Sequence, residues 1–164
     1  MNVKKLTALS ASVALAMILS FIESLIPPLV AVPGVKIGLA NIVTVFLLYT
    51  YGAREAAAVS IVRVILSSLL FGSTVSLIYS MSGALLSLAA MLILKNLPIF
   101  SELSVSVAGG VFHNAGQIIC ACIIMENAAI ASYLPPLIIS GTIAGVAVGI
   151  LSGLLIKKLR NIIK

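Results

Sequence analysis

Long apolar stretches, broken by short polar or proline-rich segments, run along most of this 164-residue chain. Dividing the sequence at its charges and helix breakers gives six candidate helices, at residues 6–26, 37–51, 55–71, 75–94, 103–125 and 133–156. Most of them approach the roughly 20 residues that a helix needs to cross the apolar layer of a bilayer. The pattern therefore predicts one all-α membrane domain, over residues 1–164, with six transmembrane helices.

Helix breakers separate these stretches where the hydrophobic pattern alone would not. Prolines between residues 27 and 33 end the first candidate helix. The segment 72–74 divides a run from 64 to 94 that carries no charge and is too long for one crossing. Pro98 separates the fourth helix from the fifth, and Pro135 and Pro136 fall in a first helical turn, where proline is tolerated. The second candidate, 37–51, is the shortest.

Composition indicates that lipid is the solvent of these helices. Apolar residues make up 62% of the chain and charged residues 9%, and neither aspartate nor tryptophan occurs. Such values lie far outside the range of soluble domains. The sequence thus excludes an ordinary soluble enzyme or binding domain.

The basic residues indicate how the helices are oriented. With a cytoplasmic N-terminus and an even number of crossings, the outside carries only Lys36, and the inside carries Lys4, Lys5, Arg54, Lys95, Lys157, Lys158, Arg160 and Lys164. The positive-inside rule favours this arrangement, so we expect both termini to be cytoplasmic. The basic residues are dispersed over short loops, and the net charge of +6 therefore marks orientation rather than nucleic-acid binding.

Two ladders of small residues, spaced four apart, run through the first and last candidate helices. The first ladder consists of Ala8, Ser12, Ala16, Ser20 and Ser24, and the second of Gly141, Gly145, Gly149 and Gly153. This spacing places each set on one stripe of a helix, where the lack of bulk lets another helix approach closely in lipid. Both stripes are predicted to be packing surfaces.

Arg63 is a charged side chain at membrane depth, which is costly and so points to function. It follows Arg54 by nine residues. That separation is about 13 Å along a helix, which places Arg63 near the middle of the bilayer. Its guanidinium could pair with Glu23 or with freed backbone carbonyls, or it could contact an anionic ligand. The sequence leaves these interpretations open.

A denser polar cluster lies in the fifth candidate helix. His113 and Gln117 share a helix face with Gly109, and Asn114 lies beside them. These side chains could form an inward-facing binding wall, or they could serve hydrogen bonding between helices. Other polar residues that could complete such a wall are Asn41, Ser67 and Ser68.

The segment 27–36, apolar and stiffened by three prolines, is the longest predicted outside loop. It could be a lid over a cavity that opens to the outside, since Lys36 and Asn41 follow where a ligand would be covered. Alternatively, it could be an interfacial connector.

No metal or cofactor is expected. Cys120 and Cys122 point to nearly opposite sides of a helix, so they cannot readily form a disulfide with each other and are expected to be buried small residues. A metal site would need more ligands than these two cysteines and the one histidine of the chain.

Five motifs carry a family resemblance: PGVKIGLAN at residues 33–41, YGAREA at 51–56, Arg63, FGS at 71–73, and His113-Asn114-x-Gly116-Gln117. Together they resemble the bacterial Gx transporter family, also labelled heptaprenyl diphosphate synthase component I, over essentially the whole chain. That family is similar to the S components of energy-coupling factor (ECF) importers, six-helix proteins that capture vitamins or related compounds from outside. The resemblance implies an ECF S-component-like bundle in the bacterial cytoplasmic membrane.

The resemblance also implies partners and site residues. S components dock on a transmembrane coupling subunit through small residues spaced four apart in the first helix, and two cytoplasmic ATPases drive transport. Carried over to this chain, the docking stripe is Ala8, Ser12, Ala16 and Ser20, with serine at 12 where the family pattern favours alanine. If the chain captures a small solute, vitamin-like or anionic and isoprenoid-related, the polar residues discussed above are the expected contacts, namely Lys36, Asn41, Arg63, His113, Asn114 and Gln117.

Two hypotheses of function are compatible with these features. In the first, the chain is the solute-binding subunit of an ECF-type importer, and in the second it is a non-catalytic membrane subunit of heptaprenyl diphosphate or quinone biosynthesis. A catalytic synthase is not expected, because prenyl transfer holds a diphosphate through magnesium ions and aspartate-rich motifs, and this chain has four glutamates and no aspartate. The sequence contains no P-loop, so any ATPase must be a partner.

Overall fold

The computed structural model describes residues 3–25 and 38–163, which form helices joined by turns, with no strand in either range. The helices are α1 (Val3–Leu25), α2 (Asn41–Thr50), α3 (Ala53–Phe71), α4 (Thr74–Lys95), α5 (Glu102–Ile124), the short 3-10 helix η1 (Ala128–Tyr133) and α6 (Leu134–Ile163). The predicted all-α class is confirmed. The largest differences from the predicted boundaries are at α2, which begins only at Asn41, and at α6, which continues to Ile163.

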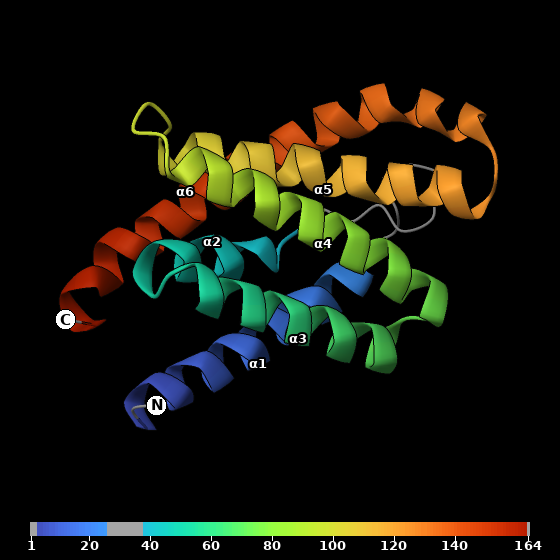
Figure 1. Cartoon of the computed structure of the whole chain (residues 1–164). Coiled ribbons are helices and arrows are strands. Elements are labelled where there is room, and N and C mark those ends of the chain that lie inside the picture. Colours follow the sequence, from blue (N-terminus) through green and yellow to red (C-terminus); the bar gives the residue numbers. More distant parts are fainter. Residues whose placement is uncertain (1–2, 26–37, 164) are drawn as a thin grey trace.

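Successive helices from α1 to α6 run in alternate directions along the bundle, so the start of α1 and the end of α6 lie at the same end of the molecule (Figure 1). We call this end the basic end and the opposite one the far end. The turn between α2 and α3, the end of α4 and the start of α5 also lie at the basic end. All the lysines whose side chains the structure describes lie there, namely Lys4, Lys5, Lys95, Lys157 and Lys158.

Charged side chains fasten helices together at the basic end. The ammonium group of Lys5 forms an ion pair with the carboxylate of Glu55, which ties α1 to the first turn of α3. Lys95, in the last turn of α4, donates a hydrogen bond to the carbonyl of Leu48 and lies 5.3 Å from the centroid of the Tyr49 ring. A cation is favourable there because the last carbonyls of α2 carry the negative end of the helix dipole.

Four helical segments are long and apolar enough to cross a membrane: Val3–Leu25, Thr74–Lys95, Glu102–Ile124 and Ala128–Lys158. The sequence predicted six crossings. The helix α2 has only 10 residues, which gives it a length of about 15 Å, roughly half of the apolar layer of a bilayer. The helix α3 has 19 residues but carries Arg54, Glu55 and Arg63. Six crossings therefore remain a prediction.

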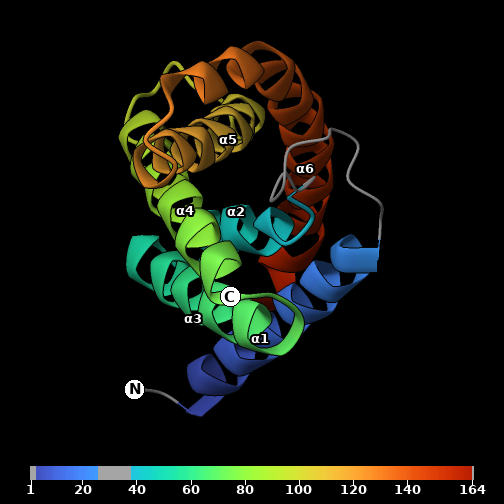
Figure 2. The same cartoon turned by 90° about the vertical axis from the view of Figure 1, so that its right-hand side faces the viewer.

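The short helix α2 occupies the middle of the bundle. The helices α1, α3, α4, α5 and α6 pack in that order, each against the next, and we call this arrangement the helix arc. Inside the arc, α2 contacts α1, α3 and α6 (Figure 2). Its side chains Val45, Leu47 and Leu48 are at most 1% exposed and form the centre of the apolar core. Because α2 runs from Asn41 to the basic end, it fills the basic half of the arc with apolar side chains.

Glycines bring α4, α5 and α6 into close contact. A Cβ atom added at Gly145 would lie 2.6 Å from the Cα atom of Val107, and one added at Gly116 would lie 2.8 Å from the carbonyl oxygen of Ser82. Hydroxyl groups reinforce these contacts, since Ser106 donates a hydrogen bond of 2.9 Å to the carbonyl of Gly145. The predicted packing stripe of α6 is therefore confirmed at Gly141, Gly145 and Gly149, which face α5.

Two of the sequence motifs form turns between helices. Gly52 has a φ angle of 115° between α2 and α3, in a region that residues with a side chain rarely adopt. Ser73 precedes α4, and its side chain accepts a hydrogen bond of 3.2 Å from the backbone N–H of Ser76. Such N-terminal capping by serine explains why α4 starts here. These local signals divide the uncharged run at 72–74 as predicted.

Candidate functional site

Among the residues whose burial the structure describes, the buried side chains that carry a charge, an imidazole or an amide lie between the middle and the far end of the bundle. They are Glu23, Arg63, His113, Asn114 and Gln117. Three buried serines in the basic half, Ser87, Ser106 and Ser152, by contrast donate hydrogen bonds to helix carbonyls, as Ser87 does to Gly109 at 2.8 Å. Because α2 begins at Asn41 and fills the basic half, the polar interior lies beyond the start of α2. We call this region the polar half.

Arg63 lies on α3 and is 9% exposed. Its Nη1 atom donates a hydrogen bond of 3.4 Å to the hydroxyl of Ser20 on α1, and the carboxylate of Glu23 is close enough to interact with it electrostatically. Its Nε atom is buried and has no hydrogen-bond partner among the described residues. Glu23 thus contributes to the electrostatic environment of Arg63, while a direct pair between the two side chains and a contact of Arg63 with a ligand both stay predictions.

Glu23 connects this arginine to the start of α2. Its side chain is 5% exposed, and its carboxylate accepts a hydrogen bond from the backbone N–H of Gly38. Gly38 has a φ angle of 84°, and its carbonyl accepts a hydrogen bond of 2.9 Å from the backbone N–H of Asn41. The amide of the half-buried Asn41 side chain lies beside this turn. The structure therefore joins Arg63 and Asn41 through Glu23 and Gly38.

The polar residues of α5 face its two neighbours in the helix arc. His113 and Gln117 are 8% and 7% exposed and lie against Gly83 of α4. Asn114 donates a hydrogen bond of 2.8 Å from Nδ2 to the carbonyl of Leu137, near the start of α6. Asn114 therefore serves hydrogen bonding between helices, which was one of the two predicted interpretations.

Tyr79 is a candidate site residue that the sequence analysis missed. It lies on α4 and is 7% exposed, and its hydroxyl is buried with no hydrogen-bond partner among the described residues. A buried tyrosine hydroxyl usually has a partner. The only signal in the sequence is a tyrosine six residues into an apolar helix, which is too common a feature to indicate a site.

The predicted site residues form two clusters on different parts of the helix arc. Arg63 and Asn41 belong to the first, together with Ser20 and Glu23, where α1, α3 and the start of α2 meet. The second is on α5 and contains His113, Asn114 and Gln117, of which His113 and Gln117 lie against Gly83 of α4, one helical turn after Tyr79. The helix α4 packs between α3 and α5 and separates the two clusters along the arc. Ser67, one helical turn beyond Arg63, is also buried. Lys36 and the predicted lid 27–36 lie outside the described residues.

The predicted docking stripe of α1 faces in part toward the chain's own helices. Ala16 and Ser20 are 1% and 5% exposed, whereas Ala8 and Ser12 are half-buried. The large side chains Leu15, Ile18 and Ile22 instead form the exposed face of this helix. In this conformation, only the half of the stripe near the basic end offers surface to a partner, and the docking role stays a prediction.

The polar half contains hydrogen-bond donors that have no partner among the described residues. A guanidinium N–H and a phenol hydroxyl are both suited to hydrogen bonding with an acceptor such as a carbonyl, carboxylate or phosphate oxygen. Within the described residues, no three side chains of histidine, cysteine, aspartate or glutamate are grouped so that they could hold a metal ion. Cys120 and Cys122 are free thiols, both half-buried.

Comparison with known proteins gives one family match. The family model described as heptaprenyl diphosphate synthase component I matches residues 12–155. Neither a search of curated proteins nor one of solved structures gave a significant match. The matched range runs from the middle of α1 to the last turns of α6, so it includes both clusters of the polar half. The chain belongs to the heptaprenyl diphosphate synthase component I family.

Proposed function

We propose that this chain is the solute-binding membrane subunit of an importer of the ECF type. The single observation that carries the proposal is the buried Nε atom of Arg63, which has no partner among the described residues. Leaving such a buried polar group unpaired costs about 1–3 kcal/mol. A ligand oxygen at this position would remove that cost, and the buried hydroxyl of Tyr79 could contribute in the same way.

The shape of the bundle favours capture from one side. In our proposal, all six helices contribute to crossing the membrane, with both termini and the basic end in the cytoplasm of a bacterium. The apolar side chains of α2 then close the cytoplasmic half, while the polar half faces outward. A solute with an anionic group or a carbonyl could reach Arg63 from outside, with Lys36, Asn41, His113 and Gln117 as further proposed contacts. We also propose that this solute is vitamin-like or related to isoprenoids.

Copurified small molecules provide the test of ligand capture. The chain is purified with its natural lipids, and released compounds are compared by mass spectrometry between the native protein and Arg63→Gln. We expect a compound that the native protein retains and the variant loses. Arg54→Gln is the matched control, because Arg54 is exposed at the basic end. Retention of the same compounds by Arg63→Gln would contradict the proposal.

Import would require partners, since the sequence contains no P-loop. We propose a transmembrane coupling subunit and two cytoplasmic ATPases, with Ala8 and Ser12 as the accessible part of the docking stripe. Ala8→Leu should reduce copurification of these subunits. The control Ala14→Leu adds the same bulk on a different, exposed face of α1 and should leave the complex intact. Equal recovery of the complex with both variants would argue against docking through this stripe.

A second function is favoured by the family description. A family called heptaprenyl diphosphate synthase component I implies a second component, so the chain could be a non-catalytic membrane subunit beside a synthase that supplies the magnesium-binding residues. This alternative predicts that adding the purified chain, in lipid, raises the heptaprenyl diphosphate output of the partner component. The importer proposal predicts no change in that output.

A further inference from the structure

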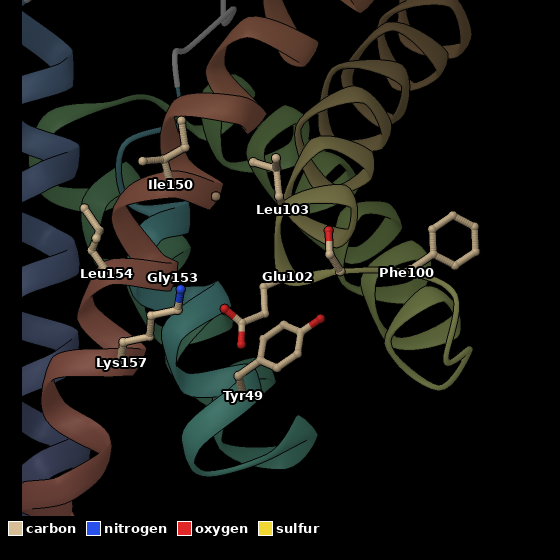
Figure 3. Close-up of a pocket in the computed structure, with 10 residues that line it drawn as sticks. Tyr49, Phe100, Glu102, Leu103, Ile150, Gly153, Leu154 and Lys157 are labelled. Atoms are coloured by element: carbon tan, nitrogen blue, oxygen red, sulfur yellow. The ribbon is translucent and has the colours of Figure 1, made fainter.

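An open groove lies at the basic end of the molecule, away from the polar half. It has a volume of about 590 Å³ and lies where the end of α2, the start of α5 and the last turns of α6 meet (Figure 3). Volumes of this size are typical of sites for small organic ligands. The groove shares no residue with the two clusters of the polar half, so its occupant is independent of the proposed function.

The walls of the groove are mostly apolar and exposed. Leu103 and Phe100 line it near the start of α5, and Ile150 and Leu154 line it on α6, where they are 53% and 60% exposed. Gly149 also lines the groove, and Leu103 packs closely against it, since a Cβ atom added at Gly149 would lie 2.7 Å from Cδ1 of Leu103. Exposed apolar side chains on a membrane protein are suited to contact with hydrocarbon chains.

One negative and one positive group face each other across this groove. Figure 3 shows the carboxylate of Glu102 and the ammonium group of Lys157 pointing toward one another, with the ring of Tyr49 beside the carboxylate. Between these two described side chains the structure records no ion pair, whereas Lys5 and Glu55 do pair at the same end. The two charges are thus placed to hold a ligand that carries both signs.

We propose that this groove binds a phospholipid with an ethanolamine headgroup. The primary amine of the headgroup donates hydrogen bonds to Glu102, its phosphate accepts from Lys157, and an acyl chain lies along Leu103, Ile150 and Leu154. The charge pair matches a zwitterion better than an anion, because a purely anionic lipid would be repelled by Glu102. The lysines at this end place the groove at the level of lipid headgroups.

The test measures lipid occupancy by native mass spectrometry of the purified chain. Lipids with ethanolamine, choline or glycerol headgroups and the same acyl chains are added in turn at equal concentration. We expect occupancy by the ethanolamine lipid to exceed that by the choline lipid about fivefold, because a trimethylated amine cannot donate a hydrogen bond to a carboxylate. Equal occupancy by the two lipids, preference for the anionic glycerol headgroup, or no bound lipid because a protein segment fills the groove would each overturn the proposal.

Substitutions test which group of the lipid headgroup each of the two charged side chains binds. Glu102→Gln should lower occupancy by the ethanolamine lipid to that of the choline lipid, while Lys157→Gln should weaken binding of both, since both contain the phosphate. The matched controls are Lys158→Gln, whose side chain does not line the groove, and Glu126→Gln at the far end. If either single variant fails to fold, the exchange Glu102→Lys with Lys157→Glu keeps both charges, and it should retain the preference for ethanolamine. Loss of that preference in the exchanged protein, or its persistence in Glu102→Gln, contradicts the assignment.

Discussion

Arg63 and Glu23 show that the effect of a buried charge on stability depends on the groups around it. An arginine in the middle of a lipid-facing bundle needs compensation, and here Ser20 and Glu23 provide part of it. The carboxylate is itself held by the backbone N–H of Gly38. The hydrogen bond from Arg63 to Ser20 therefore links α3 to α1, and the bond from Gly38 to Glu23 links the turn before α2 to α1, so both charged residues support the fold as well as the proposed site.

A double-mutant cycle separates these two contributions. Glu23→Gln should lower the free energy of unfolding of the chain in detergent by about 3 kcal/mol or more, because it leaves the arginine buried without the nearby negative charge. Adding Arg63→Gln to that variant should recover part of the loss, whereas two independent residues would give additive losses. The measurement is the unfolding midpoint of the four proteins. Strict additivity would show that Arg63 is not held by Glu23.

Tyr79 offers a more conservative test, since phenylalanine removes only the hydroxyl. That hydroxyl is buried and has no described partner, so Tyr79→Phe should leave the stability of the ligand-free chain unchanged or raise it by up to about 1 kcal/mol. Retention of the copurified compound should fall at the same time. Tyr133→Phe is the control, because Tyr133 is 46% exposed on η1. A large loss of stability in Tyr79→Phe would mean that the hydroxyl has a structural partner.

At the scale of helices, the glycines of α6 and the serines of α5 set how closely these two elements approach. The side of α6 that carries Gly141, Gly145 and Gly149 lies against α5, and Ser106 bonds across the contact. The small residues of α1 act differently. Ala16 and Ser20 pack inside the chain, while Ala8 and Ser12 keep accessible surface. Small residues at the same spacing thus serve internal packing in α6, whereas in α1 half of them pack internally and half keep accessible surface.

Alanine substitutions in α6 test whether the close approach of α5 depends on the position of a glycine within the stripe. Gly145→Ala should destabilise the chain by about 1–3 kcal/mol, because the added methyl group would overlap the backbone of Val107 and force α5 and α6 apart. Gly153→Ala should have little effect, since its Cβ would lie 3.4 Å from only one atom, in the flexible side chain of Glu102. Thermal unfolding of both variants checks the prediction. Similar midpoints for the two variants would mean that the helices can adjust at no cost.

For the molecule as a whole, the alternating helices place the start of α1, the end of α6 and the described lysines at the same end of the bundle (Figure 1). The short α2 lies within the helix arc and divides the interior into an apolar basic half and a polar half. In the proposed function, this division means that a solute reaches the polar groups from outside only.

Cysteine accessibility in intact cells tests that direction. In a chain whose Cys120 and Cys122 are replaced by serine, a cysteine at Asn127, in the turn after α5, should react with a membrane-impermeant maleimide added from outside. A cysteine at Asn96, in the turn after α4, should react only after the membrane is opened, because it lies at the basic end. The reverse pattern would contradict both the orientation and the proposed capture from outside.

Local patterns along the chain were enough to predict the all-α class, the approximate helices and the glycine stripe of α6. Hydrophobicity, helix breakers and small residues at spacing four act locally along the chain, so they can be interpreted without knowing the neighbours of a helix. The burial of Arg63 near Glu23 could also be predicted, because a charge within the membrane must face protein or water and Glu23 was one of the partners that the sequence offered. Three features became visible only in the three-dimensional structure. The helix α2 is central, Ala16 and Ser20 face inward, and the Tyr79 hydroxyl is buried without a partner among the described residues. These features depend on the rotation and tilt of each helix about its axis, which are set by packing between whole helices and not by the order of residues within one.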